Sequence, residues 1–342
     1  MEVESNDKIN VVVYFQNGSQ SCDDVLNMLE SMQQDIPHNL ILLDIDKDES
    51  LKGTYISSVP VVEVGPYVLK NIITKADLNV ALGAARDRKI HLDLKGGRDF
   101  QRRVEHGQKI TGTDKFTIWI SKHYMFLFNV IVILYIGLPF LAPVFAKMQL
   151  NGPAKILYSL YSPLCHQLSF RSWFLFGEQA FYPRELAGIQ GLITYEKLTG
   201  SNNINLTEAR KFIGNDVVGY KVALCERDIA IYGAILLFGI IFSLSRNRIR
   251  PIRWYLWVIF GIIPIGLDGF SQLPSLLEYV FTINFPIRES TPILRTITGT
   301  LFGLFTAWYL YPLVEETMLD TRRTVAKKQA YISQIVSDKK VG

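Results

Sequence analysis

The chain has 342 residues, more than the usual single domain of roughly 100–150 residues, so more than one structural unit is expected. Charged residues make up 20% of it, the formal net charge is +4, and three cysteines are present, which excludes a disordered, collagen-like or disulfide-scaffold protein. The basic residues are dispersed and cluster mainly beside apolar segments, which is typical of membrane flanks and speaks against nucleic-acid binding.

The first 115 residues have the mixed polar and apolar texture of a cytosolic domain. In chain order, the pattern predicts a strand over residues 9–15, a helix over 22–34, a second buried strand over 39–45, a hairpin over 59–64 and 67–69, and a closing helix over 75–86. The first apolar run is too short for a signal peptide, so we expect the N-terminus to remain in the cytoplasm, where it is synthesised.

Residues 8–88 resemble the glutaredoxin-like members of the thioredoxin superfamily, through the strand-turn-helix of residues 11–26 and the Ser-Val-Pro-Val run at 58–61. The resemblance implies a thioredoxin-like α+β fold over residues 1–90, with Pro60 at the position of the cis-proline. The family's active-site Cys-x-x-Cys aligns with Ser-Gln-Ser-Cys at residues 19–22, so Ser19 stands at the nucleophilic position and only Cys22 keeps its sulfur. We therefore expect a module that stabilises the chain or docks a cytoplasmic protein partner; a monothiol role for Cys22 is the alternative.

Four apolar runs follow, at residues 124–146, 229–244, 254–273 and 296–314. The first has 23 residues without a formal charge, enough to cross a hydrocarbon core of about 30 Å. After a linker at residues 91–123, the runs predict an all-α membrane bundle of four spans in a lipid bilayer. Buried helices of a soluble core are the alternative.

Basic residues flank these runs unevenly: they fill the loop at residues 246–253 and follow the fourth run at 322–328. Because such loops stay cytoplasmic, both termini are predicted to lie in the cytoplasm, including a tail at residues 315–342. The protein itself is predicted to lie in the cell (inner) membrane of a bacterium. An excursion at residues 147–228 is then outside. Within it, residues 153–182 predict an interfacial or re-entrant helix, and Asn205 or Thr207 caps a short helix that ends near Gly214.

This topology brings four polar sets to the outer face at a similar depth. The sets are Cys165, His166, Gln167 and Arg171; Cys225, Glu226, Arg227 and Asp228; Asp268 and Gln272; and Arg288, Ser290, Arg295 and Thr298. An acid within the membrane, such as Asp268, is costly, so we expect it to have an arginine partner.

The motifs Cys-His-Gln at 165–167, Cys-x-Arg-Asp at 225–228, Asp-Gly-x-x-Gln at 268–272 and Arg-x-x-Thr-Gly at 295–299 resemble a bacterial membrane-protein family classed only as a domain of unknown function. The resemblance covers about residues 150–312 and implies no activity. In many relatives the second motif looks more like Cys-x-Arg-Cys, so Asp228 replaces a second cysteine and weakens a thiolate-rich metal site.

Three chemical interpretations of the outer site remain open. In the first, Cys165, His166 and Cys225, with Asp228 or Asp268, bind zinc or another borderline divalent metal. In the second, Cys165 and Cys225 form a structural disulfide. In the third, His166 and Asp268 are the acid–base candidates, and a phosphate or carboxylate head group is bound by Gln167, Arg171, Arg227, Gln272, Arg288 and Arg295. The alternative to the third interpretation is that the arginines only neutralise Asp228, Asp268 and Glu289 in buried pairs, which is the arrangement of a non-catalytic assembly protein.

Overall fold

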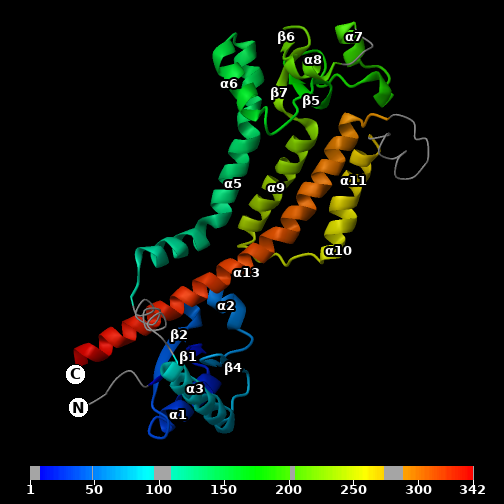
Figure 1. Cartoon of the computed structure of the whole chain (residues 1–342). Helices are drawn as coiled ribbons and strands as arrows, with labels where there is room; N and C mark the ends of the chain where they lie inside the picture. The colour runs from blue at the N-terminus through cyan, green and yellow to red at the C-terminus, as the bar shows by residue number, and fades with distance from the viewer. Residues whose placement is uncertain (1–7, 48, 96–108, 201–204, 273–287, 342) are drawn as a thin grey trace. The chain divides into compact units, whose positions relative to one another are not determined.

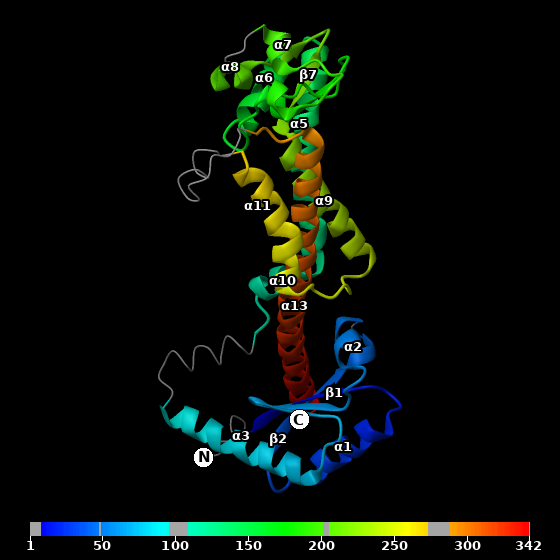
Figure 2. The ribbon, with the colours of Figure 1, turned by 90° about the vertical axis from the view of Figure 1, so that its right-hand side faces the viewer.

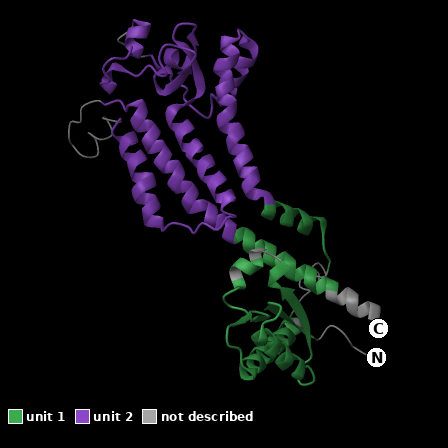
Figure 3. Ribbon diagram, turned by 180° about the vertical axis from the view of Figure 1, so that it is seen from behind, with its two compact units in different colours: residues 1–122, 317–342 green, residues 123–316 purple. Residues whose placement is uncertain are grey.

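The computed structural model describes residues 8–47, 49–95, 109–200, 205–272 and 288–341 (Figure 1). The chain divides into two compact units, one of residues 1–122 with 317–342 and the other of residues 123–316 (Figure 3). The C-terminal end of the chain therefore belongs to the same unit as the N-terminal end.

The first unit is built on a four-stranded sheet with the order β2-β1-β3-β4. Strand β1 (Ile9–Phe15) pairs in parallel with β2 (His38–Asp44), whereas β3 (Val61–Val64) pairs antiparallel with both β1 and β4 (Tyr67–Lys70). Helix α1 (Gln20–Ser31) makes the crossover that a parallel pair requires. This unit confirms the mixed α+β region expected from the sequence.

Three further elements complete the N-terminal part of this unit: the turn η1 (Ile45–Lys47), α2 (Glu49–Tyr55) and α3 (Lys75–Lys95). Helix α2 has seven residues, too few to show a helical period, which explains why the sequence pattern missed it. Helix α3 continues past the predicted end at residue 86, into the stretch expected to be a linker.

Both faces of the sheet are covered, because successive side chains of β1 point to opposite sides. Val11 and Val13 pack in a core with residues of α1 and α3. Tyr14 belongs to a second core with Tyr55 of α2, against which Tyr331 of α13 (Pro292–Val341) packs. The C-terminal segment thus packs on a face of the sheet for which the sequence pattern predicted no covering element.

Three helices of the described residues are long and apolar enough to cross a membrane: Gly112–Lys147 (α5), Glu226–Leu244 (α9) and Pro292–Ser333 of α13. They contain the expected spans 124–146, 229–244 and 296–314. The remaining span corresponds to a shorter apolar helix, Trp254–Phe270, made of α10 (Trp254–Trp257), the π-helical turn η4 (Val258–Ile262) and α11 (Ile263–Phe270). Residue 273, where the expected span ends, lies outside the described residues.

Residues 148–225, named here the cap, join α5 to α9 and gather at one end of the long helices of their unit (Figure 2). Their helices are α6 (Asn151–Tyr161), η2 (Ser169–Arg171), η3 (Glu185–Ala187), α7 (Tyr195–Thr199) and α8 (Leu206–Lys211). Strands β5 (Ser172–Leu175), β6 (Gly214–Asn215) and β7 (Gly219–Cys225) form an antiparallel sheet of order β5-β7-β6.

The expectation of an all-α membrane part is wrong for the cap. Helix α6 occupies only the first part of the segment predicted as one interfacial helix, and β5 lies in its second part. Strand β7 escaped notice because Lys221 interrupts its apolar pattern. The Asn205 cap is confirmed, since its side chain accepts the backbone N–H groups of Thr207 and Glu208 at the start of α8.

One glycine shows how tightly the cap is built. A Cβ atom on Gly177 would lie 2.1 Å from the backbone oxygen of Val218, far inside van der Waals contact. Only a residue without a side chain allows the segment after β5 to pass this close to the start of β7.

Candidate metal centre

Two thiols and a carboxylate converge where the cap meets α9. Cys165 follows α6, Cys225 ends β7, and Asp228 lies in the first turn of α9. One ligand atom from each residue lies within 4.8 Å of the other two. Both cysteines are free, so no disulfide joins them in this structure. Thiolate and carboxylate groups are ligands of zinc and other borderline divalent cations.

Gln167 stabilises the turn that carries Cys165 through three hydrogen bonds. Its backbone N–H donates to Cys165 Sγ at 3.4 Å, and its side-chain nitrogen donates to the carbonyl oxygens of Tyr158 at 2.9 Å and Ala223 at 3.0 Å. These two carbonyls use both N–H groups of the amide. Gln167 has a φ of 51°, in the left-handed region, so the turn reverses the chain sharply at this point.

A buried lysine, Lys221 of β7, completes this support. Its side chain is fully buried, and its Nζ donates to the carbonyl oxygens of Gln167, at 2.8 Å, and of Arg210. The Tyr158 hydroxyl donates to the Lys221 carbonyl at 2.6 Å. Burial lowers the pKa of Lys221 from 10.5 to about 7. Sequence reasoning missed this residue, although a lysine inside an apolar run before a Cys-x-Arg-Asp motif was a usable signal.

The two thiols at the centre influence each other. A hydrogen bond from Cys225 lowers the pKa of Cys165, whereas the same hydrogen bond, together with burial, raises the pKa of Cys225 well above its ordinary value. Cys165 is therefore the thiol of this pair that ionises more readily.

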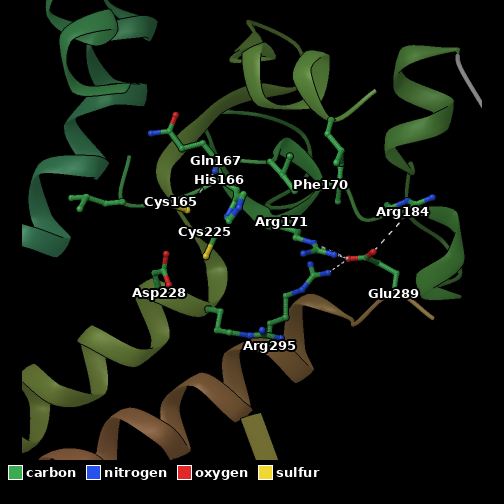
Figure 4. Close-up of a pocket in the computed structure, with 14 residues that line it drawn as sticks. Cys165, His166, Gln167, Phe170, Arg171, Arg184, Cys225, Asp228, Glu289 and Arg295 are labelled. Carbon is green, nitrogen blue, oxygen red and sulfur yellow. Dashed lines mark hydrogen bonds and ion pairs between the residues drawn. The ribbon is translucent and has the colours of Figure 1, made fainter. Parts of the chain in front are cut away.

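A cavity of about 480 Å³ opens beside these thiols (Figure 4). Its size falls within the range of small-molecule sites. Residues of the cap, of the segment before α13 and of the first turns of α9 and α13 form its lining: Leu164, Cys165, His166, Gln167, Leu168, Phe170, Arg171, Arg184, Leu206, Cys225, Arg227, Asp228, Glu289 and Arg295. Both cysteine-containing motifs therefore meet at one cavity with three of the predicted arginines, Arg171, Arg227 and Arg295.

His166 is exposed and lines the cavity, but it lies outside the group of three close ligand atoms. Its roles as a metal ligand or as an acid–base residue stay predictions.

Three arginines from separate elements converge on one carboxylate, that of Glu289 (Figure 4): Arg171, Arg184 and Arg295. Arg171 Nε donates to Glu289 Oε1 at 2.9 Å, and Arg184 Nη1 lies 3.7 Å from Oε2. Arg295 also pairs with the fully buried Glu226 at 3.4 Å. These ion pairs tie the cap to the starts of α9 and α13. Arg184 belongs to no motif, so the sequence offered no signal for it.

Asp268 of α11 has the arginine partner that the sequence predicted. Its carboxylate, 2% exposed, pairs with Arg227 of α9 and lies 3.7 Å from Arg288. Gln272 donates to the Asp268 carbonyl at 2.7 Å and accepts from Arg171 at 3.3 Å. Asp268, Gln272 and Arg288 are not among the cavity-lining residues, so a catalytic role for Asp268 and ligand binding by the other two stay predictions.

The residues at the thioredoxin-like positions lie in the other unit. The thiol of Cys22 is free and fully buried in the first turn of α1, and Ser19 Oγ lies 3.0 Å from Ser21 Oγ. The Val59–Pro60 peptide bond is cis. The Cys22 thiol thus packs inside the core and is not presented to solvent.

Comparisons with known proteins match part of the chain. The uncharacterized protein MJ1492 of Methanocaldococcus jannaschii is 27% identical over 205 residues, which are 58% of this chain and 96% of the relative. This relative is archaeal, so it lends no support to the expected bacterial origin. A family described as predicted membrane protein (DUF2085) matches residues 208–309, the stretch that carries Cys225, Asp228, Asp268 and Arg295. Residues 208–309 of this chain are thus similar to a family of predicted membrane proteins.

Proposed function

We propose that this chain is an integral membrane protein that binds a divalent cation such as zinc through Cys165, Cys225 and Asp228. The observation that carries the proposal is the approach of three ligand atoms to within 4.8 Å of one another. All three residues also line the cavity, so a bound cation would keep a coordination position open toward it. Three protein ligands with one open position are the arrangement of catalytic zinc sites.

For the membrane part, we infer four spans in the inner membrane of the cell. Both termini then lie in the cytoplasm, and the metal centre lies at the outer face. The 17-residue helix Trp254–Phe270 supports the fourth span. It extends about 25 Å, close to the roughly 30 Å of a hydrocarbon core. The arginines at residues 246–253 support the orientation.

For the N-terminal unit, we infer a thioredoxin-like fold that serves as a docking module for a cytoplasmic protein. The sheet order β2-β1-β3-β4, with one parallel pair and two antiparallel pairs, supports the fold. The serine at position 19 and the buried thiol of Cys22 support a role without dithiol chemistry.

Metal binding tests the main proposal. The full-length chain is purified in detergent and titrated with Co²⁺, whose visible spectrum reports thiolate ligands, in competition with Zn²⁺. We expect one cation per chain, and we expect Cys165→Ser, Cys225→Ser and Asp228→Asn each to weaken binding by at least about tenfold. Cys22→Ser is the matched control, since it removes the only cysteine outside the centre.

Two outcomes would overturn the proposal. The first is a chain that folds and binds no cobalt with thiolate character. The second is cobalt binding that Cys22→Ser abolishes and that Cys165→Ser and Cys225→Ser leave intact.

A purely structural role is the second candidate, favoured by the ion pairs of Asp268 and Glu289 with arginines of neighbouring elements. In that case the polar residues only hold the helices and the cap together. The serine variants at Cys165 and Cys225 would then change thermal stability without any change in cation content.

A further inference from the structure

We propose that the cavity beside the metal centre receives a phosphate group, with one oxygen on the cation and the others on Arg171 and Arg227. This inference rests on the proposed function, because it needs a cation held by Cys165, Cys225 and Asp228. It adds the chemical class of the ligand that fills the open coordination position.

The first support is that cation ligands and guanidinium groups share one cavity. Asp228 and Arg227 are consecutive residues in the first turn of α9, and Arg171 reaches the same cavity from η2. A volume of about 480 Å³ leaves room for a phosphate group and a substituent.

The second support is that both arginines keep unused donors. Arg227 pairs with Asp268 through Nη2, but its buried Nε has no hydrogen-bond partner in the part of the chain that the structure describes. Arg171 uses Nε and Nη2 for Glu289 and Gln272, while its Nη1 makes no hydrogen bond to any described residue. A guanidinium has five N–H donors, and the buried Nε of Arg227 is unfavourable without an acceptor, which an oxyanion would supply. The Arg171 side chain is 36% exposed, and its Nη1 is available as a second donor to the same oxyanion.

The charges around the cavity allow an anion to enter. Among the residues that the structure describes, five arginines and four acids form the ion pairs of this region, which leaves one positive charge in excess: Arg171, Arg184, Arg227, Arg288 and Arg295 against Glu196, Glu226, Glu289 and Asp268. A divalent cation held by two thiolates and a carboxylate carries one net negative charge, which this excess offsets. The anion therefore meets no net repulsion and gains charge-assisted hydrogen bonds.

The geometry favours phosphate over carboxylate. The cation, Arg171 and Arg227 are three separate partners, and a phosphate monoester offers three terminal oxygens, whereas a carboxylate offers two. Leu164 and Leu206 line the cavity while 58% and 61% exposed, so an apolar substituent would contact them at its mouth. A soluble phosphate monoester and the head group of a phosphatidic acid share this chemistry.

The test uses the full chain loaded with Co²⁺ in detergent. Its visible spectrum is recorded during titration with glycerol 3-phosphate and, in a second arm, with a short-chain phosphatidic acid; acetate is the planar control. We expect both phosphates to shift the cobalt bands and acetate to have little effect. Arg171→Gln and Arg227→Lys should weaken phosphate binding about tenfold or more with cobalt affinity unchanged. Arg227→Lys keeps a cation beside Asp268, so the fold is preserved, and the exposed Arg88→Gln is the control.

Each outcome has a distinct meaning. Much tighter binding of phosphatidic acid supports a lipid ligand, and equal binding supports a soluble one. Cobalt bands that no phosphate shifts, or that acetate shifts equally well, overturn the phosphate inference and leave the metal centre standing. A chain that binds no cobalt overturns the proposed function itself.

Discussion

Asp228 and Asp268 are two acids of the same helical part that differ in their partners. The carboxylate of Asp268 is paired with Arg227 and approached by Arg288. That of Asp228 has no ion pair or hydrogen bond with any residue that the structure describes, and it lies beside two thiols instead. The same residue type is therefore expected to stabilise the helices at one position and to bind a cation at the other.

Asp268→Asn should lower the free energy of unfolding by about 3 kcal/mol, because it leaves the partly buried guanidinium of Arg227 without its counter-charge. Asp228→Asn should change it by less than about 1 kcal/mol in the absence of a divalent cation. Denaturant unfolding of the two variants in detergent, with and without Zn²⁺, measures both effects. Equal destabilisation by the two substitutions would contradict this division of roles.

The buried Lys221 should make stability depend on pH. Burial lowers the pKa of Lys221 to about 7, from the 10.5 of a lysine in water. Of its charged neighbours, Cys165 raises this pKa and Arg210 lowers it. Between these pH values the unfolded chain binds one proton more, so stability from this residue rises with pH and is lost as pH falls toward 7. The slope is at most about 1.4 kcal/mol per pH unit.

The measurement compares unfolding free energies of wild type and Lys221→Met from pH 7 to pH 10. We expect the difference to move in favour of the wild type as pH rises. Lys197→Met, at an exposed position of α7, is the control and should show no such trend. A difference that stays constant with pH would show that Lys221 is charged throughout.

At the scale of elements, α9 and α13 approach each other through glycine. A Cβ atom on Gly303 would lie 2.1 Å from the backbone oxygen of Ile231, and one on Gly299 would lie 2.8 Å from that of Arg227. The obstacle is backbone in both cases, so no side-chain rotation can relieve it. This close contact sets the distance between the helix that carries Asp228 and the helix that carries Arg295.

Gly303→Ala should therefore force the two helices apart and destabilise the protein by about 1–3 kcal/mol, with a smaller effect for Gly299→Ala. Gly233→Ala on α9 is the matched control, since nothing lies within 4 Å of its Cβ position. It should be neutral or stabilising by up to about 1 kcal/mol, because alanine favours the helix. Thermal unfolding in one detergent ranks the three variants, and a tolerated Gly303→Ala would argue against this packing.

For the whole molecule, the inferred topology assigns the cap and the C-terminal segment to opposite sides of the membrane. Val217 of the cap is 62% exposed, and the Asp320 side chain of α13 is 74% exposed. In a chain whose native cysteines are replaced by serine, Val217→Cys should react with a membrane-impermeant thiol reagent in intact cells. Asp320→Cys should react only after permeabilisation, and the reverse pattern would invert the orientation.

Much of this architecture was accessible from hydrophobic pattern. Periodicity indicated the strands β1 and β2 and the helix α1, and uncharged runs located α5, α9 and α13, because burial and membrane insertion depend on local composition. The predicted topology also placed Cys165 and Cys225 at the same end of the helices. The sequence pattern missed strand β7, because Lys221 looks polar in sequence and its two carbonyl partners come from other segments of the chain.

By itself, the sequence determined that a polar α+β region precedes apolar helices and that cysteines, arginines and acids gather at one end of them. Only the tertiary structure decided which side chains meet: Asp228 with the two thiols, Asp268 with Arg227, and three arginines with Glu289. The physical reason is that a helix or strand is selected by the residues near it in the chain, whereas hydrogen bonds and ion pairs depend on distances of a few ångströms. Those distances join segments far apart in the chain, and packing alone sets them.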